Sequence, residues 1–374
     1  MKKVLVISNE VSHKSGWGRV ALEISKCMEH KGLQVKNVCG SSSIKDEKII
    51  IDNLFSLKQW NLKKIVLTLV DVIRIIFKLR KSFDYIIASD ESSIILAYYI
   101  SKIFNVPFSF ISYGTYALKI VSEFNVKIHK KALQNAETIF ISSSFSAKEF
   151  MKLTKEYDKK IRVIPLGVSQ EFLDYPILKN TKKNEIVTIG AVKERKGLLE
   201  ILKAIHLIES KNRPTVNVIG ALDQAETYVK KVLKFVKENN LEKFIKFYNQ
   251  IPDQKMLKIL DQSKIFVLPS KNTKDGNFEG FGIVFLEASS RTLPVIGSQD
   301  CGNVDAVIHD HTGYLVDQGD IETLKNMILR LLKDDELSNN MGTSGRVFAK
   351  KMTWMNTTEI ILKNINNQCQ KKSF

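Results

Sequence analysis

Length, composition and charge narrow the classes of protein to consider. The chain has 374 residues, which at roughly 150 residues per domain predicts two or three domains. Its 44% hydrophobic and 26% charged residues are typical of a globular protein and exclude disordered and fibrous proteins. The formal charge of +17 favours anionic partners such as phosphorylated small molecules, acidic membranes or nucleic acid. A lysine-rich surface that only maintains solubility explains that charge equally well.

The cysteines, histidines and apolar runs indicate the compartment. The four cysteines form no CxxC pair, so we expect neither a disulfide framework nor a zinc site. The six histidines are interpreted as structural or surface residues, because no Cys or acid lies at ligand spacing. The first apolar run, Val4–Ser8, is too short for a signal peptide, and no run approaches the roughly 18 residues of a transmembrane helix. We therefore expect a reduced, cytoplasmic protein.

The N-terminal half opens with a strand, a glycine-containing loop, a helix and a second strand. Short apolar runs predict strands at Val4–Ser8, Val35–Val38, Tyr85–Ala88, Phe108–Ser112 and Thr138–Ile141. Helical patterns separate these runs. Such alternation predicts a parallel sheet with helices on both faces.

Residues 58–81 form a separate feature of this half. They predict a helix with a wide apolar face that is ringed by lysine and arginine. A basic amphipathic helix can lie in a membrane interface, so this segment is a candidate for peripheral membrane contact. A core-facing helix with a solvated basic edge is the alternative.

A second series of strands and helices begins at Glu185. The predicted strands are Ile186–Ile189, Val216–Ile219, Ile245–Phe247, Ile265–Leu268 and Val295–Ile296. The predicted helices are 197–209, 223–239, 254–262 and 282–291, followed by two closing helices at 320–350 and 356–368. The chain therefore predicts two doubly wound α/β domains joined near Leu166–Lys183. Ligands of such sheets bind at the carboxyl ends of the strands, and a cleft between two facing sheets is the default site.

The first chemical motif is the glycine-containing turn Ser15-Gly16-Trp17-Gly18-Arg19, which follows the first strand and opens a helix. Glycine lets backbone N–H groups approach a phosphate, and a helix N-terminus favours an anion. The turn is not GxGxxG, and no GxxxxGK[ST] occurs in the chain. These absences argue against a nicotinamide dehydrogenase and a P-loop NTPase.

Two further motifs lie in the second half. Lys193, Arg195 and Lys196 cluster before Gly197, at the turn that follows the first strand of that half. Fixed cations at this place can hold a diphosphate and stabilise it as it departs. The strongest motif is residues 277–288, where Glu279 precedes a Gly-Phe-Gly turn and Glu287 follows within a predicted helix. Solvated charges at a helix start are the alternative interpretation of the basic turn.

Together these motifs resemble the family-four retaining glycosyltransferases of GT-B fold. Glu279 and Glu287 match the E-x7-E motif of the family, and residues 195–197 match its basic phosphate-binding turn. Gly16 to Arg19 resembles its N-terminal glycine-rich loop. The sequence of residues 279–288 is also similar to that of some phosphatidylinositol mannoside mannosyltransferases, which use GDP-mannose. The resemblance covers nearly the whole chain and implies two facing Rossmann-like domains with a cleft between them.

The resemblance also implies roles for individual residues. Lys196 and Glu279 would be the catalytic pair, with Lys196 on the leaving diphosphate and Glu279 on the donor sugar. Arg195 would assist at the diphosphate, and Glu287 would bind the ribose. The other implied donor contacts are Phe281, Gly282, Ile283, Gly16, Gly18, Asn249 and Ile251. Tyr113 and Trp17 are candidates for contact with the acceptor or the sugar. No DxD triplet occurs, so we expect neither a metal nor another cofactor.

Two positions depart from the family pattern. Ala191 stands where the family often has an arginine, five residues before the phosphate-binding lysine, and Arg195 or Lys193 is available to compensate. Tyr113 stands where the family often has a histidine followed by glycine. A phenol can hydrogen-bond a sugar hydroxyl, but it is not a base at neutral pH. Both substitutions are compatible with a different choice of donor or with weaker catalysis.

The resemblance therefore implies a retaining hexosyltransferase, and the missing DxD triplet adds the expectation that it needs no metal. It would move sugar from a UDP- or GDP-sugar to a glycan or glycolipid acceptor in cell-surface polysaccharide or glycoconjugate synthesis, in the cytoplasm or at the inner membrane face. A non-catalytic sugar-binding or scaffold subunit of the same fold is the alternative. An epimerase, a phosphorylase and a nucleic-acid-binding protein are weaker alternatives, and we expect no nucleic-acid partner. The expected domains are 1–172 on the acceptor side, 173–352 on the donor side, and a C-terminal helix in 353–374 that packs back on the first.

Overall fold

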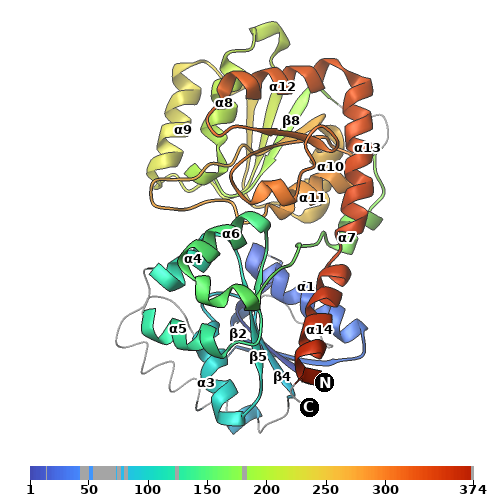
Figure 1. Cartoon of the computed structure of the whole chain (residues 1–374). Coiled ribbons are helices and arrows are strands. Elements are labelled where there is room, and N and C mark those ends of the chain that lie inside the picture. The colour runs from blue at the N-terminus through green and yellow to red at the C-terminus, as the bar shows by residue number, and fades with distance from the viewer. Residues whose placement is uncertain are drawn as a thin grey trace. The chain divides into compact units, whose positions relative to one another are not determined.

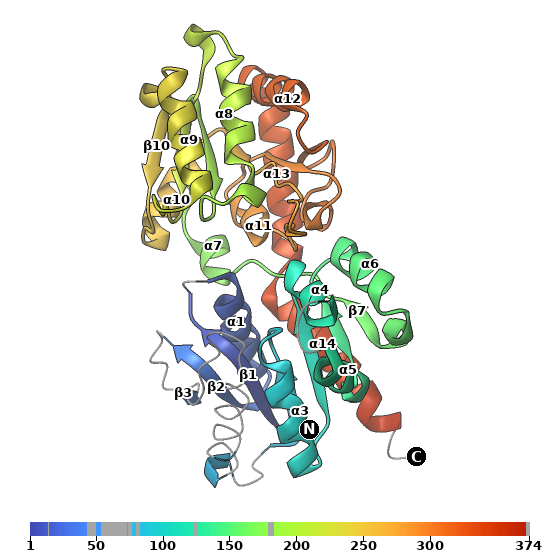
Figure 2. The same ribbon diagram turned by 90° about the vertical axis from the view of Figure 1, so that its left-hand side faces the viewer.

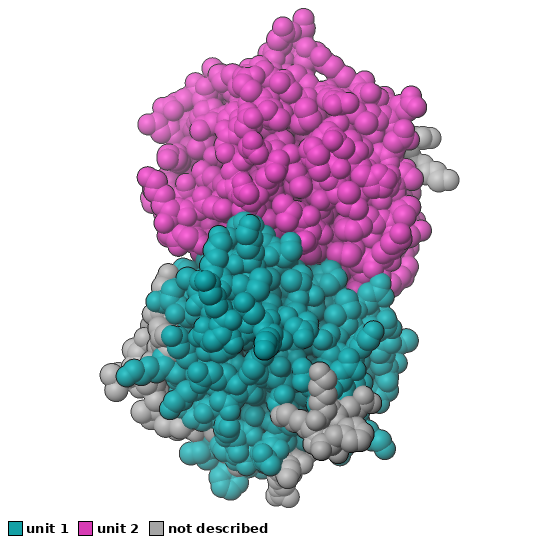
Figure 3. All heavy atoms as spheres, viewed as in Figure 1, with its two compact units in different colours: residues 1–166, 354–374 teal, residues 167–353 magenta. Residues whose placement is uncertain are grey.

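Two separate parallel sheets organise the chain. The computed structural model describes residues 1–13, 15–42, 50–53, 73, 77–79, 83–122, 126–178 and 183–371. Unit 1 comprises Met1–Leu166 and Trp354–Phe374, and unit 2 comprises Gly167–Thr353 (Figures 1 and 3). Each unit has its own buried hydrophobic cluster. The predicted fold class, α/β with two doubly wound domains, is confirmed.

Unit 1 contains a seven-stranded sheet in the order β3-β2-β1-β4-β5-β6-β7, and all its strand pairs are parallel. Its strands are β1 (Lys3–Val11), β2 (Gln34–Ser42), β3 (Ile50–Asn53), β4 (Tyr85–Ala88), β5 (Phe108–Ser112), β6 (Ile139–Ile141) and β7 (Ile161–Val163). Figure 2 shows β1, β2 and β3 side by side. The strand order reverses between β1 and β4, so this pair marks the switch point of the sheet.

Six helices cover the sheet of unit 1 among the residues that the structure describes. They are α1 (Gly16–His30), α3 (Ile94–Phe104), α4 (Thr115–Ser122), α5 (Val126–Asn135), α6 (Ser144–Leu153) and α14 (Trp354–Lys371). Helix α14 packs against α1, and its Thr357 hydroxyl donates to the Pro165 carbonyl oxygen at 2.7 Å. Lys31, the C-cap of α1, forms an ion pair of 2.6 Å with Glu359 of α14. The last helix of the chain therefore belongs to the first unit.

Unit 2 contains a six-stranded parallel sheet in the order β10-β9-β8-β11-β12-β13. Its strands are β8 (Glu185–Ile189), β9 (Thr215–Ile219), β10 (Ile245–Tyr248), β11 (Ile265–Val267), β12 (Val295–Ser298) and β13 (Gly313–Val316). Its helices are α7 (Gln170–Asp174), α8 (Leu198–His206), α9 (Thr227–Glu238), α10 (Asp253–Gln262), α11 (Ile283–Ser290), α12 (Ile321–Lys333) and α13 (Asp335–Lys351). The order reverses between β8 and β11, which are adjacent and parallel.

A buried arginine attaches the start of unit 2 to its core. The guanidinium of Arg291 is fully buried and pairs with Asp261 at 2.8 Å. It also donates to the carbonyl oxygens of Phe172, Tyr175 and Pro176. These bonds hold α7 within unit 2, so unit 1 ends at Leu166, six residues before the expected boundary at 172.

Two predicted helices differ in outcome. The single helix expected at 320–350 is wrong, because Asp334 separates α12 from α13 and its carboxylate caps α13 by accepting from the Leu337 N–H at 2.9 Å. The expected helix at 58–81 lies largely outside the described residues, so its membrane contact stays a prediction. Among the described residues, no helix is both long and apolar enough to cross a membrane.

Candidate active site

The turn after β8 presents two cations at the switch point of unit 2. A short 3-10 helix, Glu194–Lys196, ends at Gly197, whose φ of +69° is the left-handed conformation that glycine adopts readily. A Cβ atom at Gly197 would lie 1.9 Å from the Pro269 carbonyl oxygen. Only glycine therefore allows this turn to approach the segment that follows β11, which leads toward Glu279.

Glu279 receives both cations on one carboxylate oxygen. Its Oε2 lies 2.5 Å from Arg195 Nη1 and 2.6 Å from Lys196 Nζ. Glu279 is itself buried, with 8% of its surface exposed, and its carbonyl oxygen accepts from the Gly302 N–H at 2.7 Å. The structure thus brings together three residues that the sequence analysis singled out, at the carboxyl ends of adjacent strands.

The electrostatics of this trio favour an ionised carboxylate. Burial alone raises the pKa of Glu279, but Lys196 and Arg195 outweigh burial and hold that pKa below its ordinary value. Burial also lowers the pKa of Lys196, a shift that Glu279 opposes. Two basic side chains thus face one carboxylate within the trio. A site with surplus fixed cations can bind the oxygens of a diphosphate.

The N-terminus of α11 adds neutral donors close to Glu279. Gly282 is the N-cap with φ of +88°, and no side chain caps the helix there. The first N–H groups of a helix have no partner within the helix, and its dipole favours an anion at this end. Phe281 is buried just before the cap, and Ile283 is the first helical residue. Glu287 lies inside α11 and is 3% exposed.

Asn249 and Ile251 lie apart from this trio, in the turn after β10. This turn leaves the same edge of the sheet, two strands from β8, which at ~4.8 Å per strand is about 10 Å away. Asn249 is exposed and Ile251 half-buried. The turn is therefore available to a ligand longer than a diphosphate.

The remaining predicted residues lie in unit 1, around the N-termini of α1 and α4. Ser15 caps α1 by accepting from the Gly18 N–H at 3.0 Å. A Cβ atom at Gly18 would lie 2.9 Å from the Ser12 backbone nitrogen, whereas one at Gly16 would meet nothing within 4 Å. The Trp17 ring contacts Tyr116 edge-on, with 4.8 Å between ring centroids. Packing therefore requires glycine at residue 18 but not at residue 16.

Tyr113 is buried at the end of β5, and 7% of its surface is exposed. Among the described residues its hydroxyl has no hydrogen-bond partner. Its backbone N–H donates to Glu91 at 2.5 Å, and the Ser112 hydroxyl donates to the same carboxylate oxygen at 2.8 Å. Burial raises the pKa of Glu91 to about 8. The sequence analysis missed Glu91, although two adjacent acids one residue beyond a buried strand were a visible signal.

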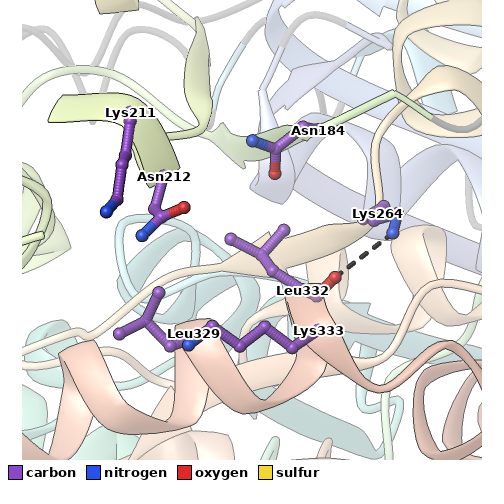
Figure 4. Close-up of a pocket in the computed structure, with 7 residues that line it drawn as sticks. All are labelled: Asn184, Lys211, Asn212, Lys264, Leu329, Leu332 and Lys333. Atoms are coloured by element: carbon purple, nitrogen blue, oxygen red, sulfur yellow. Dashed lines mark hydrogen bonds between the residues drawn. The ribbon is translucent and has the colours of Figure 1, made fainter. Parts of the chain in front are cut away.

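A surface hollow of about 400 Å³ lies elsewhere on unit 2 (Figure 4). It is lined by Asn184, Lys211, Asn212, Lys264, Leu329, Leu332 and Lys333. Asn184 and Lys264 directly precede β8 and β11, so the hollow is at the amino ends of the strands. Glu279 and Lys196 follow the carboxyl ends of the same strands, so this hollow is not the candidate active site. Within the described residues, no group of three or more His, Cys, Asp or Glu side chains could hold a metal ion.

Comparisons with known proteins place the chain in a family. Residues 14–172 match the profile described as Glycosyltransferase Family 4, and residues 169–348 match that of Glycosyl transferases group 1. The chain is 26% identical over 174 residues to the amylovoran biosynthesis glycosyltransferase AmsK of Erwinia amylovora, covering 46% of this chain and 42% of AmsK. It is 26% identical over 172 residues to the capsular polysaccharide biosynthesis glycosyltransferase CapM of Staphylococcus aureus, covering 44% of this chain and 42% of CapM. The matched part thus spans less than half the length of these curated relatives.

A solved structure supports the fold over the whole chain. The complex of Anabaena Alr3699/HepE with UDP superposes with a TM-score of 0.81 at 16% identity, covering 98% of this chain and 100% of the other. The two family profiles together match most of both units. The chain therefore belongs to the family-four glycosyltransferases of GT-B fold.

Proposed function

We propose that this protein transfers a hexose from a nucleoside diphosphate sugar to a glycan or glycolipid acceptor, with retention at the anomeric carbon and without a metal ion. The observation that carries the proposal is the convergence of Arg195 and Lys196 on Glu279 beside the N-terminus of α11. Relatives named for amylovoran and capsular polysaccharide biosynthesis support a role in surface polysaccharide synthesis. The UDP complex of the structural neighbour supports a nucleotide donor.

In this proposal, catalysis consists mainly of stabilising the leaving group. As the bond from the anomeric carbon to the phosphate oxygen breaks, negative charge develops on the diphosphate and positive charge on the sugar. Arg195, Lys196 and the first N–H groups of α11 stabilise the diphosphate without reorganising. Glu279 is ionised and binds sugar hydroxyls, while Glu287 binds the ribose. The acceptor oxygen bonds to the same face of the sugar, and its proton passes to the departing phosphate.

The same trio explains how donor binding can proceed without an arginine at residue 191. Arg195 already supplies a guanidinium within 2.5 Å of Glu279. A phosphate that enters the site would take over the bonds that the two cations now make to Glu279. The carboxylate would then be released toward the sugar.

A non-catalytic sugar-binding subunit is the second candidate, because Ala191 and Tyr113 depart from the family pattern. One experiment separates the two candidates. Wild type and Lys196→Ala are incubated with UDP- and GDP-sugars, with EDTA, and sugar release or transfer is measured. Turnover by wild type that disappears in the variant supports the transferase. Nucleotide binding by wild type without any turnover supports the non-catalytic candidate.

A further inference from the structure

The segment after β11 runs along the turn that carries Arg195 and Lys196. The close approach of Gly197 to the Pro269 carbonyl oxygen places the two backbones in contact. Two residues later, the Lys271 N–H donates to the Arg195 carbonyl oxygen at 2.9 Å. The backbone of Arg195 is therefore held by Lys271 rather than only by its own turn.

The side chain of Lys271 makes a second attachment. Its Nζ lies 3.3 Å from Glu194 Oε1 and 3.0 Å from Glu200 Oε1. Glu194 immediately precedes the two cations, and Glu200 lies in the first turn of α8 just after them. One ammonium group thus joins both ends of the turn. Partial burial lowers the pKa of Lys271, but the two carboxylates outweigh it and hold that pKa above its ordinary value.

Glu200 depends on this lysine. The Glu200 side chain is 8% exposed, and its second oxygen has no hydrogen-bond partner among the described residues. A buried carboxylate without a cation is costly, so Glu200 holds the Lys271 ammonium at this place. The start of α8 is fixed in addition by the Tyr228 hydroxyl, which accepts from the Leu199 N–H at 3.0 Å.

We propose that Lys271 is a positioning residue for the donor diphosphate: by joining Glu194 and Glu200 it holds the turn in the shape that aims Arg195 and Lys196 at the phosphate oxygens. This inference rests on the proposed function. It assigns Lys271 no contact with the substrate, since its ammonium is already bound by two carboxylates. Fixed cations stabilise a leaving group best when they are in place before negative charge develops on the diphosphate. Lys271 holds Arg195 and Lys196 in place in this way.

The chain offers a matched control. Lys264 has the same side-chain exposure as Lys271, 23%, and it also pairs with a carboxylate, Asp335, at 2.7 Å. Its Nζ donates to the Leu332 carbonyl oxygen as well, at 3.2 Å. Lys264 precedes β11, whereas Lys271 follows it. Substituting each lysine by methionine removes the same charge from opposite ends of one strand.

The test is calorimetric titration of UDP and of GDP into wild type, Lys271→Met, Lys264→Met and Lys271→Arg, well below the melting temperature. We expect Lys271→Met to raise the nucleotide Kd about tenfold, because displaced cations bind the diphosphate less well. Lys264→Met should leave the Kd unchanged, and Lys271→Arg should recover most of the affinity. With donor and acceptor varied separately, the donor KM should rise and the acceptor KM should not. Equal affinity in the two methionine variants would overturn the proposal.

A double variant keeps the test decisive if Lys271→Met folds poorly. Lys271→Met/Glu200→Gln removes the buried unpaired charge and should regain thermal stability. If the double variant is stable but still binds the nucleotide weakly, Lys271 acts by positioning. If it regains wild-type affinity, Lys271 serves only to neutralise Glu200 and the proposal is wrong. Failure of wild type itself to bind either nucleotide would instead remove the proposed function, and this inference with it.

Discussion

The two units place opposite kinds of chemistry at the carboxyl ends of similar sheets. In unit 2, two cations meet the single carboxylate of Glu279 at the switch point. In unit 1, Asp90 and Glu91 are buried after β4, and no cation among the described residues shifts the pKa of either carboxyl group. Ser8, Ser92 and backbone N–H groups satisfy Asp90 instead. The loops after the strands, rather than the shared fold, therefore decide what each unit can bind.

The carboxyl groups of the two units have pKa values that are shifted in opposite directions. The cations of unit 2 lower the pKa of Glu279, whereas burial raises the pKa of Asp90 and of Glu91 in unit 1. Unit 2 is thus suited to a charged phosphate. Unit 1 instead buries two carboxyl groups that bond to serines and backbone N–H groups, beside a Tyr113 hydroxyl that has no partner among the described residues. The predictions below test this contrast.

The largest expected effect is that of Lys196→Ala. Loss of one fixed cation at the leaving group should lower kcat/KM by about 10³-fold, or ~4 kcal/mol of transition-state stabilisation. Steady-state transfer or donor hydrolysis measures it. Lys203→Ala is the control, because Lys203 is an exposed lysine of α8 in the same unit. An equal loss in both variants would mean that general positive charge, and not the geometry of Lys196, drives the reaction.

Glu279→Gln should separate binding from chemistry. The amide keeps the shape of the side chain but no longer neutralises Arg195 and Lys196. We expect turnover to fall about 10²-fold, or ~2.7 kcal/mol, while the affinity for the nucleoside diphosphate stays the same or increases. Calorimetry of UDP and GDP binding beside steady-state kinetics checks both quantities. A parallel loss of affinity and turnover would show that Glu279 only holds the turn together.

Glu91 should make stability depend on pH. Its folded pKa of about 8 is above the ordinary 4.5, so the folded state retains a proton that the unfolded state loses. The resulting stabilisation is fully present below pH 4.5 and is lost as the pH rises through 8. From pH 5 to pH 7 the free energy of unfolding should therefore fall by about 2.5 kcal/mol. Thermal unfolding across this range should show a decline that Glu91→Gln reduces.

The control for that prediction is Glu156→Gln, which alters an exposed carboxylate of the same unit. This variant should keep the wild-type pH dependence. A Glu91→Gln protein whose melting temperature falls between pH 5 and pH 7 as steeply as that of wild type would place the titrating group elsewhere.

The smallest effect concerns the Tyr113 hydroxyl. It has no partner among the described residues, so Tyr113→Phe should leave thermal stability unchanged within about 0.5 kcal/mol. If the hydroxyl binds a sugar, kcat/KM should still fall about tenfold. Tyr85→Phe is the matched control, because the buried Tyr85 hydroxyl bonds to Ser109 at 2.7 Å. That variant should lose about 1 kcal/mol of stability and keep its activity. If Tyr113→Phe lost stability but kept its kcat/KM, the Tyr113 hydroxyl would not be part of the substrate site.

Much of the fold could be predicted from local patterns. The bounds of β4 and β5 agree with the sequence prediction because both strands are continuous buried runs. Strand β7 was missed because only Ile161 of its three residues is buried, so no apolar run marks it. The break at Asp334 was missed because a capping aspartate between two amphipathic segments does not interrupt their periodicity.

Only part of the candidate site could be predicted from the sequence. The meeting of Arg195, Lys196 and Glu279 could be expected, since both loops leave adjacent strands at one edge of the sheet. The roles of Lys271 and Glu91 could not. Lys271 acts on residues more than seventy positions away in sequence, and the pKa of Glu91 depends on burial by distant segments. Such long-range packing leaves no periodic signal in the sequence.

The most direct test of the account is whether unit 2 binds a nucleoside diphosphate through Lys196 without metal. UDP and GDP are titrated into wild type and Lys196→Ala, each with and without EDTA. The account predicts that one nucleotide binds wild type with the same Kd in both conditions, and that Lys196→Ala loses this binding. Binding that disappears with EDTA, or that Lys196→Ala retains at wild-type strength, would contradict it.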